Sequence, residues 1–151
     1  MIRAAHADDQ AAVEAIVRSA YVVYVSRIGK PPGPMLDDYR ALIDAGSVSV
    51  VERPDGELAG VIVLLPRPDH LLLDNVAVRP ERQRQGLGRD LVAYAEVEAR
   101  RRGFAELRLY THRTMTENIA LYTRLGFVEP GRGRQAGYDR VFMTKHLVAA
   151  T

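Results

Sequence analysis

The sequence of 151 residues contains no cysteine, no tryptophan and only four histidines. Without cysteine the chain cannot form disulfides, thiolate nucleophiles, iron–sulfur clusters or cysteine zinc sites. The histidines stand in separate segments and lack the short spacing that is typical of a zinc site. We therefore predict no bound metal, and we expect all four histidines on the surface: His6, His70, His112 and His146.

Long hydrophobic runs are also missing. The longest apolar stretch, residues 58–65, is far shorter than the ~20 residues that a membrane-spanning helix requires. Near its start the chain carries Asp8 and Asp9 in place of the basic and then apolar leader of a secreted protein. Hydrophobic residues make up 47% and charged residues 26%, as in ordinary globular proteins. We therefore expect one soluble, cytoplasmic domain over residues 1–151, with no membrane partner.

The net charge of +2 hides an uneven distribution. Residues 1–78 contain 7 Lys and Arg against 11 Asp and Glu, whereas residues 79–134 contain 12 against 7. This asymmetry indicates either an arginine-rich solvated surface or two ligands of opposite charge, and charge alone leaves both interpretations open.

Hydrophobic periodicity and turn residues predict a mixture of strands and helices. Predicted strands cover residues 2–5, 47–52, 58–65, 71–78, 107–110, 127–129 and 138–146, with a Gly/Arg-rich turn between the last two. Predicted helices cover residues 10–24, 37–45, the segment from 87 to Gly103, and a segment from a Thr114-x-x-Glu117 capping box to Gly126. The order βααβββαβαββ indicates an α/β or α+β domain with a mixed sheet, because a helix twice connects consecutive strands.

Residues 76–89 form the most informative segment, which combines a strand end, a loop with four arginines, and a helix start with Gly86 and Gly88. The unpaired N–H groups and the positive dipole end of a helix N-terminus can bind phosphate. Two glycines at this spacing are equally compatible with a simple tight turn. The P-loop is excluded because no Gly-Lys-Ser/Thr follows. The dinucleotide fingerprint is excluded because Leu91 stands where it requires a small residue.

A second segment, residues 118–127, places Asn118 and Tyr122 four residues apart, so that a helix carries both on one face. The plain alternative is a surface asparagine beside a core tyrosine.

Together the two segments resemble the GCN5-related N-acetyltransferase (GNAT) superfamily. Gln83 to Gly88 match its acyl-CoA signature, Gln/Arg-x-x-Gly-x-Gly/Ala, and residues 118–127 are similar to its motif of an asparagine, a tyrosine and a final Gly-Phe. The resemblance implies a GNAT-like fold with a mixed central sheet of about seven strands, splayed at its middle and flanked by about four helices. It also implies acetyl-CoA as the acyl donor.

The resemblance further implies which residues bind the donor. Backbone amides of the loop that enters the central helix would receive the pyrophosphate, a backbone N–H near Val76 or Ala77 would bind the carbonyl oxygen, and the asparagine would lie near the pantetheine arm. The implied cofactor-binding residues are Val76, Ala77, Val78, Gln83, Arg84, Gln85, Gly86, Leu87, Gly88, Arg89 and Asn118.

Acyl transfer from a thioester to an amine requires a neutral amine, whose solution pKa of about 10.4 calls for a base, a water chain or a desolvated pocket. We predict Asp74 as the base because it follows three leucines on the strand that leads to the loop. A surface aspartate at a strand face is the alternative. Tyr122, near the sulfur in similar enzymes, is the predicted acid that protonates the departing thiolate.

The acceptor is encoded less clearly. In similar proteins the first two helices and their loop line its pocket, and here they supply acids that suit a cationic amine, among them Asp37 and Asp38. We therefore predict an N-acetyltransferase that acts on a primary amine of a small molecule, an amino acid or a protein, and a homodimer remains open. One alternative is a non-catalytic acyl-CoA-binding module. Another is a nucleic-acid binder, which the absence of an aromatic platform or a recognised DNA-binding motif disfavours.

Overall fold

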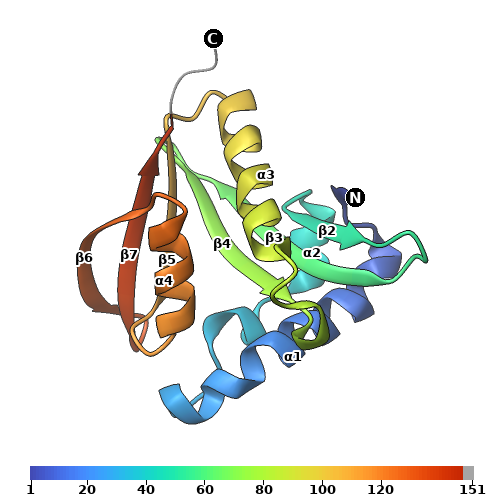
Figure 1. The fold of residues 1–151 in the computed structure, drawn as a ribbon, viewed down its shortest axis with the longest axis horizontal. Helices are drawn as coiled ribbons and strands as arrows, with labels where there is room; N and C mark the ends of the chain where they lie inside the picture. The colour runs from blue at the N-terminus through green and yellow to red at the C-terminus, as the bar shows by residue number, and fades with distance from the viewer. Residues whose placement is uncertain (148–151) are drawn as a thin grey trace. The chain divides into compact units, whose positions relative to one another are not determined.

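The computed structural model describes residues 1–147, and its elements follow the predicted order (Figure 1). The strands are β1 Ile2–Ala4, β2 Val48–Glu52, β3 Leu58–Pro66, β4 Leu71–Val78, β5 Glu106–His112, β6 Val128–Gln135 and β7 Tyr138–His146. The α-helices are α1 Gln10–Ile28, α2 Tyr39–Asp44, α3 Leu87–Arg101 and α4 Thr116–Arg124. Three short 3-10 helices are η1 Ala7–Asp9, η2 Gly33–Leu36 and η3 Pro80–Arg82.

The seven strands form one sheet in the order β1-β2-β3-β4-β5-β7-β6. β2 pairs with β1 and β3 in antiparallel fashion, β7 pairs likewise with β5 and β6, and β4 is parallel to β5. A parallel pair needs a crossover connection, which α3 provides between β4 and β5. The predicted fold class, a mixed seven-stranded sheet with four α-helices, is confirmed.

The chain divides into two compact units. The first unit comprises Met1–Leu64 and Asp74–Tyr94, and the second comprises Leu65–Leu73 and the chain from Ala95 onward. Both β4 and α3 therefore contribute residues to each unit. A single domain over residues 1–151 stays a prediction.

In the first unit the core forms between α1, β2, β3 and the first turns of α3. β3 is buried along both faces from Leu58 to Leu64, which is typical of a strand inside a sheet. Gly60 of β3 lies close to neighbouring elements. A Cβ atom there would lie 3.3 Å from the Ala77 carbonyl oxygen and 3.3 Å from Leu91 Cδ1. The missing side chain lets the start of α3 pack closely on this strand.

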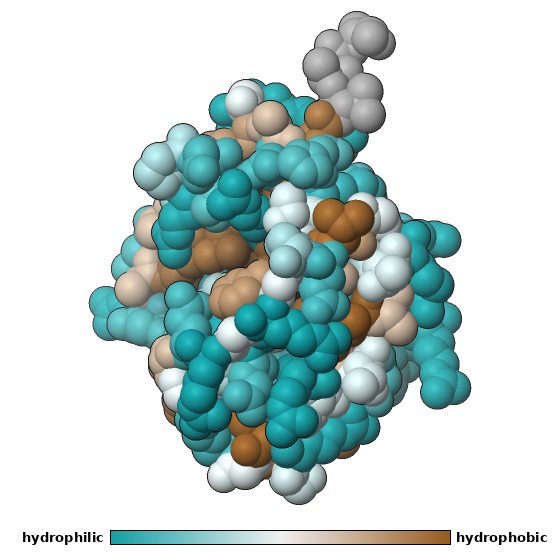
Figure 2. Space-filling model, turned by 90° about the vertical axis from the view of Figure 1, so that its left-hand side faces the viewer, coloured by the Kyte–Doolittle hydropathy of each residue, from teal (hydrophilic) through white to brown (hydrophobic). Residues whose placement is uncertain are grey.

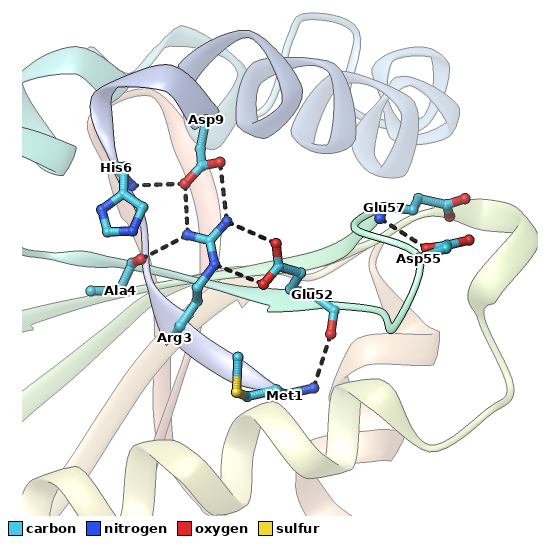
Figure 3. A network of polar contacts seen from close by, with 8 residues as sticks. All are labelled: Met1, Arg3, Ala4, His6, Asp9, Glu52, Asp55 and Glu57. Carbon is cyan, nitrogen blue, oxygen red and sulfur yellow. Dashed lines mark hydrogen bonds and ion pairs between the residues drawn. The ribbon is translucent and has the colours of Figure 1, made fainter.

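Polar contacts tie the first strand of this unit to its neighbours (Figure 3). The Arg3 guanidinium group bonds the Asp9 carboxylate at 2.8 Å and the Glu52 carboxylate at 3.2 Å, which links β1 to η1 and to β2. The bond from Arg3 lowers the pKa of Asp9, which also accepts a hydrogen bond from the His6 backbone N–H. This network is structural, since it joins elements that pair in the sheet.

In the second unit, β5 and β7 bury one face and leave the other partly exposed. Leu107 and Leu109 of β5 and Val141 and Met143 of β7 are buried, whereas Tyr110 and its β7 partner Phe142 are half-buried. Figure 2 views the molecule from the side on which β6 lies in Figure 1, and it shows a mainly hydrophilic face with smaller hydrophobic patches.

Several local predictions were wrong. The capping box at Thr114 does not form: α4 begins at Thr116 with Met115 as its N-cap, because the Thr114 hydroxyl lies 2.9 Å from His112 Nδ1. His112, which was predicted on the surface, is instead buried, with 9% of its surface exposed. The Gly/Arg-rich segment is not a turn but the second half of β6, and the reversal occurs at residues 136–137, which both have positive φ.

Candidate functional site

The loop between β4 and α3 contains two residues in the left-handed conformation. Arg84 has φ 66° and Gly86 has φ 83°. Glycine reaches this region freely, whereas a non-glycine residue such as arginine is uncommon there and is found most often at functional sites. Alternation of such residues turns successive backbone N–H groups toward one side of the loop, which favours an anion.

α3 begins directly after this turn. Its first helical hydrogen bond runs from the Asp90 N–H to the Gly86 carbonyl at 3.0 Å. The N–H groups of Leu87, Gly88 and Arg89 therefore precede the first intrahelical bond and lie at the positive end of a 15-residue helix. The structure thus contains the helix start with free N–H groups that the sequence predicted, and its binding of phosphate stays a prediction.

Several loop side chains hold the turn in place. Gln83 Nε2 donates to the Val78 carbonyl at 3.1 Å, and Arg79 Nε donates to the Leu58 carbonyl at 2.7 Å. Arg82 pairs with Glu57 at 3.2 Å. Arg84, Gln85 and Arg89 are exposed, as are Glu81 and Gln83 of the same loop. Gln83 therefore has a structural role in the loop, and its binding role stays a prediction.

Asp74 lies on β4 in the same unit as this loop. The alternating burial of β4 places Asp74, Val76 and Val78 on its partly exposed face and Asn75 and Ala77 on its buried face. The side chain of Asp37, which follows η2, is hydrogen-bonded to that of Asp74. Desolvation of its carboxyl group, followed by repulsion from the Asp74 carboxylate and by the hydrogen bond that the protonated Asp37 carboxyl donates to it, raises the pKa of Asp37 to about 6. Because Asp37 as a residue remains exposed, we regard the adjacent carboxyl as the decisive cause.

A buried polar scaffold supports this carboxyl pair. Asn75, which is 2% exposed, donates to the Tyr39 hydroxyl at 2.9 Å, and its Oδ1 lies 2.7 Å from the Tyr21 hydroxyl. The Tyr21 hydroxyl also lies 2.9 Å from the Val76 carbonyl oxygen, so the scaffold links α1 and α2 to β4. Burial, followed by the charges of Asp37 and Asp74, raises the pKa of Tyr39.

Sequence analysis missed this pairing of Asp37 with Asp74. The available signal was the acidic pair Asp37 and Asp38 after a proline-rich loop. Only Asp37 reaches β4, because Asp38 caps α2 by accepting from the Ala41 N–H.

Tyr122 and Asn118 lie on α4 in the second unit. Tyr122 is 7% exposed and packs edge-on against Phe127, with ring centroids 5.7 Å apart. Asn118 is half-buried, and its Nδ2 lies 3.7 Å from Met115 Sδ. The two residues share a helix face as predicted, and their roles toward a donor stay predictions.

Neither a metal-ligand cluster nor a membrane-spanning helix is found among the residues that the structure describes. Among residues 1–147, no group of three or more His, Asp or Glu side chains could hold a metal ion. Over the same residues, no helix has the length and apolar character needed to cross a membrane.

The carboxyl pair predicts a pH-dependent stability. A pKa raised from 3.8 to about 6 in the folded protein means that Asp37 favours folding below pH 3.8 and loses that contribution as pH rises through about 6. We therefore expect Asp37→Asn to raise Tm at pH 7 by about 1–3 °C, since the group is exposed, and to change it little at pH 4. Asp8→Asn, at an exposed aspartate of η1, is the control. An equal loss of stability at both pH values would contradict the pairing.

The model of the Acetyltransferase (GNAT) family matches residues 12–127. The [ribosomal protein bS18]-alanine N-acetyltransferase of Escherichia coli (strain K12) is 40% identical over 75 residues, which are 50% of this chain and 51% of that protein. The chain thus matches about half the length of this curated relative.

Two solved structures share the fold. The PaiA N-acetyltransferase from Thermoplasma acidophilum, in complex with coenzyme A, has a TM-score of 0.79 and 20% identity, covering 97% of this chain and 98% of that one. YncA from Salmonella typhimurium, with its cofactor acetyl-CoA, has a TM-score of 0.74 and 25% identity, covering 100% and 95%. Because the family model matches well over half of the sequence, the chain belongs to the acetyltransferase (GNAT) family, as its two motifs predicted.

Proposed function

We propose that this protein is an acetyl-CoA-dependent N-acetyltransferase that acts on a primary amine of a small molecule, an amino acid or a protein. The observation that carries the proposal is the β4–α3 turn, where left-handed Arg84 and Gly86 lead into the free N–H groups of a helix start. Coenzyme A in the PaiA structure and acetyl-CoA in the YncA structure, both on this fold, support it.

In this proposal the donor pyrophosphate binds the backbone N–H groups of Leu87, Gly88 and Arg89. The exposed guanidinium groups of Arg84 and Arg89 add positive charge at the same end of α3. Asp90 moderates that charge, since its carboxylate lies 3.8 Å from Arg89 Nε. Backbone groups of residues 76–78 would bind the acyl end of the donor, and Asn118 its pantetheine arm.

The carboxyl pair would bind and deprotonate the amine. An ammonium group is attracted to Asp74 and Asp37, which together carry more negative charge as pH rises through about 6. Asp74 then accepts the amine proton, so that the nitrogen lone pair can form the new C–N bond while the C–S bond breaks. Tyr39, Asn75 and Tyr21 would fix the pair in position through their buried hydrogen bonds.

Tyr122 would supply a proton to the sulfur that leaves. Its ring packs against Phe127, which lies in the short segment between α4 and β6. A positioned phenol can protonate a thiolate, which converts a poor leaving group into a neutral thiol. A non-catalytic acyl-CoA-binding module, the alternative reading of the same fold, would need neither this acid nor a base.

The direct test of the function is release of free thiol from acetyl-CoA in the presence of a panel of amines, amino acids and peptides. The proposal requires amine-dependent release with at least one acceptor class. Binding of acetyl-CoA without release for any acceptor would favour the binding module instead.

Two further expectations belong to this proposal. The expected cytoplasmic location is tested by cell fractionation. A homodimer is tested by sedimentation equilibrium.

The glycine turn gives a matched pair of variants. Gly86 and Gly103 both have φ 83°, so valine at either position carries similar backbone strain. At a donor concentration of about 100 Kd, wild type should gain roughly 2.7 kcal/mol and several degrees in Tm. Gly103→Val should keep this gain, whereas Gly86→Val should lose it, because its side chain occupies the phosphate side of the turn. An unchanged Tm gain in folded Gly86→Val would contradict a role of Gly86 in donor binding and would leave it only a role in forming the turn.

The acid role of Tyr122 is tested by Tyr122→Phe, which keeps the ring and its packing. Stabilisation by acetyl-CoA should survive to within about 1 kcal/mol, the net value of one hydrogen bond. In contrast, kcat at pH 8 should fall about 10²–10⁴-fold with little change in KM. Tyr94→Phe, which loses a hydroxyl bonded to Ser49 at 3.1 Å, is the control and should keep its turnover. Equal kcat for wild type and Tyr122→Phe would contradict the acid role of Tyr122, and solvent would then protonate the thiolate.

A further inference from the structure

A pocket rich in arginine lies in the second unit, at the hairpin of β6 and β7. Its volume is about 300 Å³, and it is lined by Arg113, Arg132, Gly133, Arg134, Asp139 and Arg140. Its lining thus includes four arginines and one aspartate. None of these residues belongs to the donor or amine sites proposed above.

The single acid of the pocket shows what its arginines can bind. Arg113 Nε lies 3.1 Å from one oxygen of Asp139, and Arg134 Nη1 lies 3.2 Å from the other. The bonds to these arginines lower the pKa of Asp139. Arg132 has a carboxylate partner as well, Glu129, on its own strand. The arginines of this cluster therefore already bind carboxylates of the protein itself. The single negative charge of Asp139 cannot neutralise the two arginines that bind it.

Arg140 is held in a different way. Its guanidinium carbon lies 3.9 Å from the centroid of the Tyr110 ring and 5.9 Å from that of Tyr138. Stacking on an aromatic ring fixes a guanidinium group without neutralising it. Arg140 Nη1 also donates to the uncharged side-chain amide oxygen of Gln135. The pocket thus carries a positive charge that is positioned before any partner binds.

β6 also offers a backbone edge beside these side chains. It is the last strand of the sheet order and pairs with β7, and most of its residues are exposed. An edge strand presents unpaired N–H and C=O groups to which an extended peptide can add. Gly131 and Gly133 leave two neighbouring positions on one face of β6 without a side chain, and a Cβ atom at Gly131 would meet nothing within 4 Å.

We propose that the arginine pocket and the adjacent edge of β6 bind an extended acidic segment of a polypeptide, with its carboxylates paired to Arg113, Arg132, Arg134 and Arg140. The charge excess calls for several carboxylates, which a run of Asp and Glu supplies. Charge-assisted bonds from guanidinium groups to carboxylates are short and directional. This surface does not depend on acetyl transfer, and its test can fail while the proposed function stands.

An acidic polypeptide fits this surface better than a nucleic acid. Single-stranded nucleic acids bind through aromatic rings on which bases stack. The face of the Tyr110 ring is instead covered by the Arg140 guanidinium group. The rings of Tyr138 and His112 pack in a T-shaped arrangement, with their centroids 6.4 Å apart. The four arginines of the cluster line a single pocket.

The test is fluorescence anisotropy with a labelled peptide of six glutamates at about 50 mM salt, with labelled hexauridylate as the competing class. The full-length protein should bind the peptide more tightly than the RNA. The double variant Arg132→Gln with Arg140→Gln should weaken peptide binding at least about tenfold.

Folding is controlled by a second double variant, Arg113→Gln with Arg134→Gln, whose side chains are 60% and 67% exposed and whose loss should leave Tm nearly unchanged. It should weaken binding to a similar degree. Arg18→Gln with Arg40→Gln, at exposed arginines of α1 and α2, removes the same charge elsewhere and should change the affinity less than about twofold. Absence of peptide binding, equal losses in the control variant, or tighter binding of hexauridylate would each overturn the proposal.

Discussion

The left-handed turn at Gly86 is the constraint on which the rest of the account depends. This turn connects the loop after β4 to α3. Three backbone N–H groups therefore precede the first helical hydrogen bond, which the Asp90 N–H donates to the Gly86 carbonyl. The phosphate binding proposed there would use backbone groups, whose positions are fixed by the fold and which cannot be removed by changing one side chain. Side chains such as Arg79 and Gln83 serve mainly to hold the turn.

The uneven charge of the sequence acquires a structural meaning. The acidic first part of the chain supplies Asp37, which joins Asp74 in a pair suited to a cationic amine. The basic later part supplies the exposed arginines at the start of α3 and a separate arginine pocket on the β6–β7 hairpin. Exposed arginines fit the interpretation as a solvated surface, and the interpretation as two ligands of opposite charge stays a prediction.

The sequence predicted more of the fold than of the site. Element order and the bounds of β4 followed from hydrophobic patterns, and the turn at Gly86 followed from glycine spacing. The capping box at Thr114 failed because His112, buried nearby, competes for the threonine hydroxyl. The partnership of Asp37 with Asp74 could not be predicted, because it joins residues far apart in the sequence through a loop that no periodicity describes.

The central claim, that backbone amides at the start of α3 bind the donor phosphates, is tested most directly by NMR. In ¹⁵N-labelled protein, coenzyme A should shift the amide signals of Leu87, Gly88 and Arg89, and pantetheine, which lacks the phosphates, should leave them in place. The amide of Gly103, past the other end of the same helix, is the internal reference. The account would be contradicted if the three amides moved no more than Gly103, or moved equally with pantetheine.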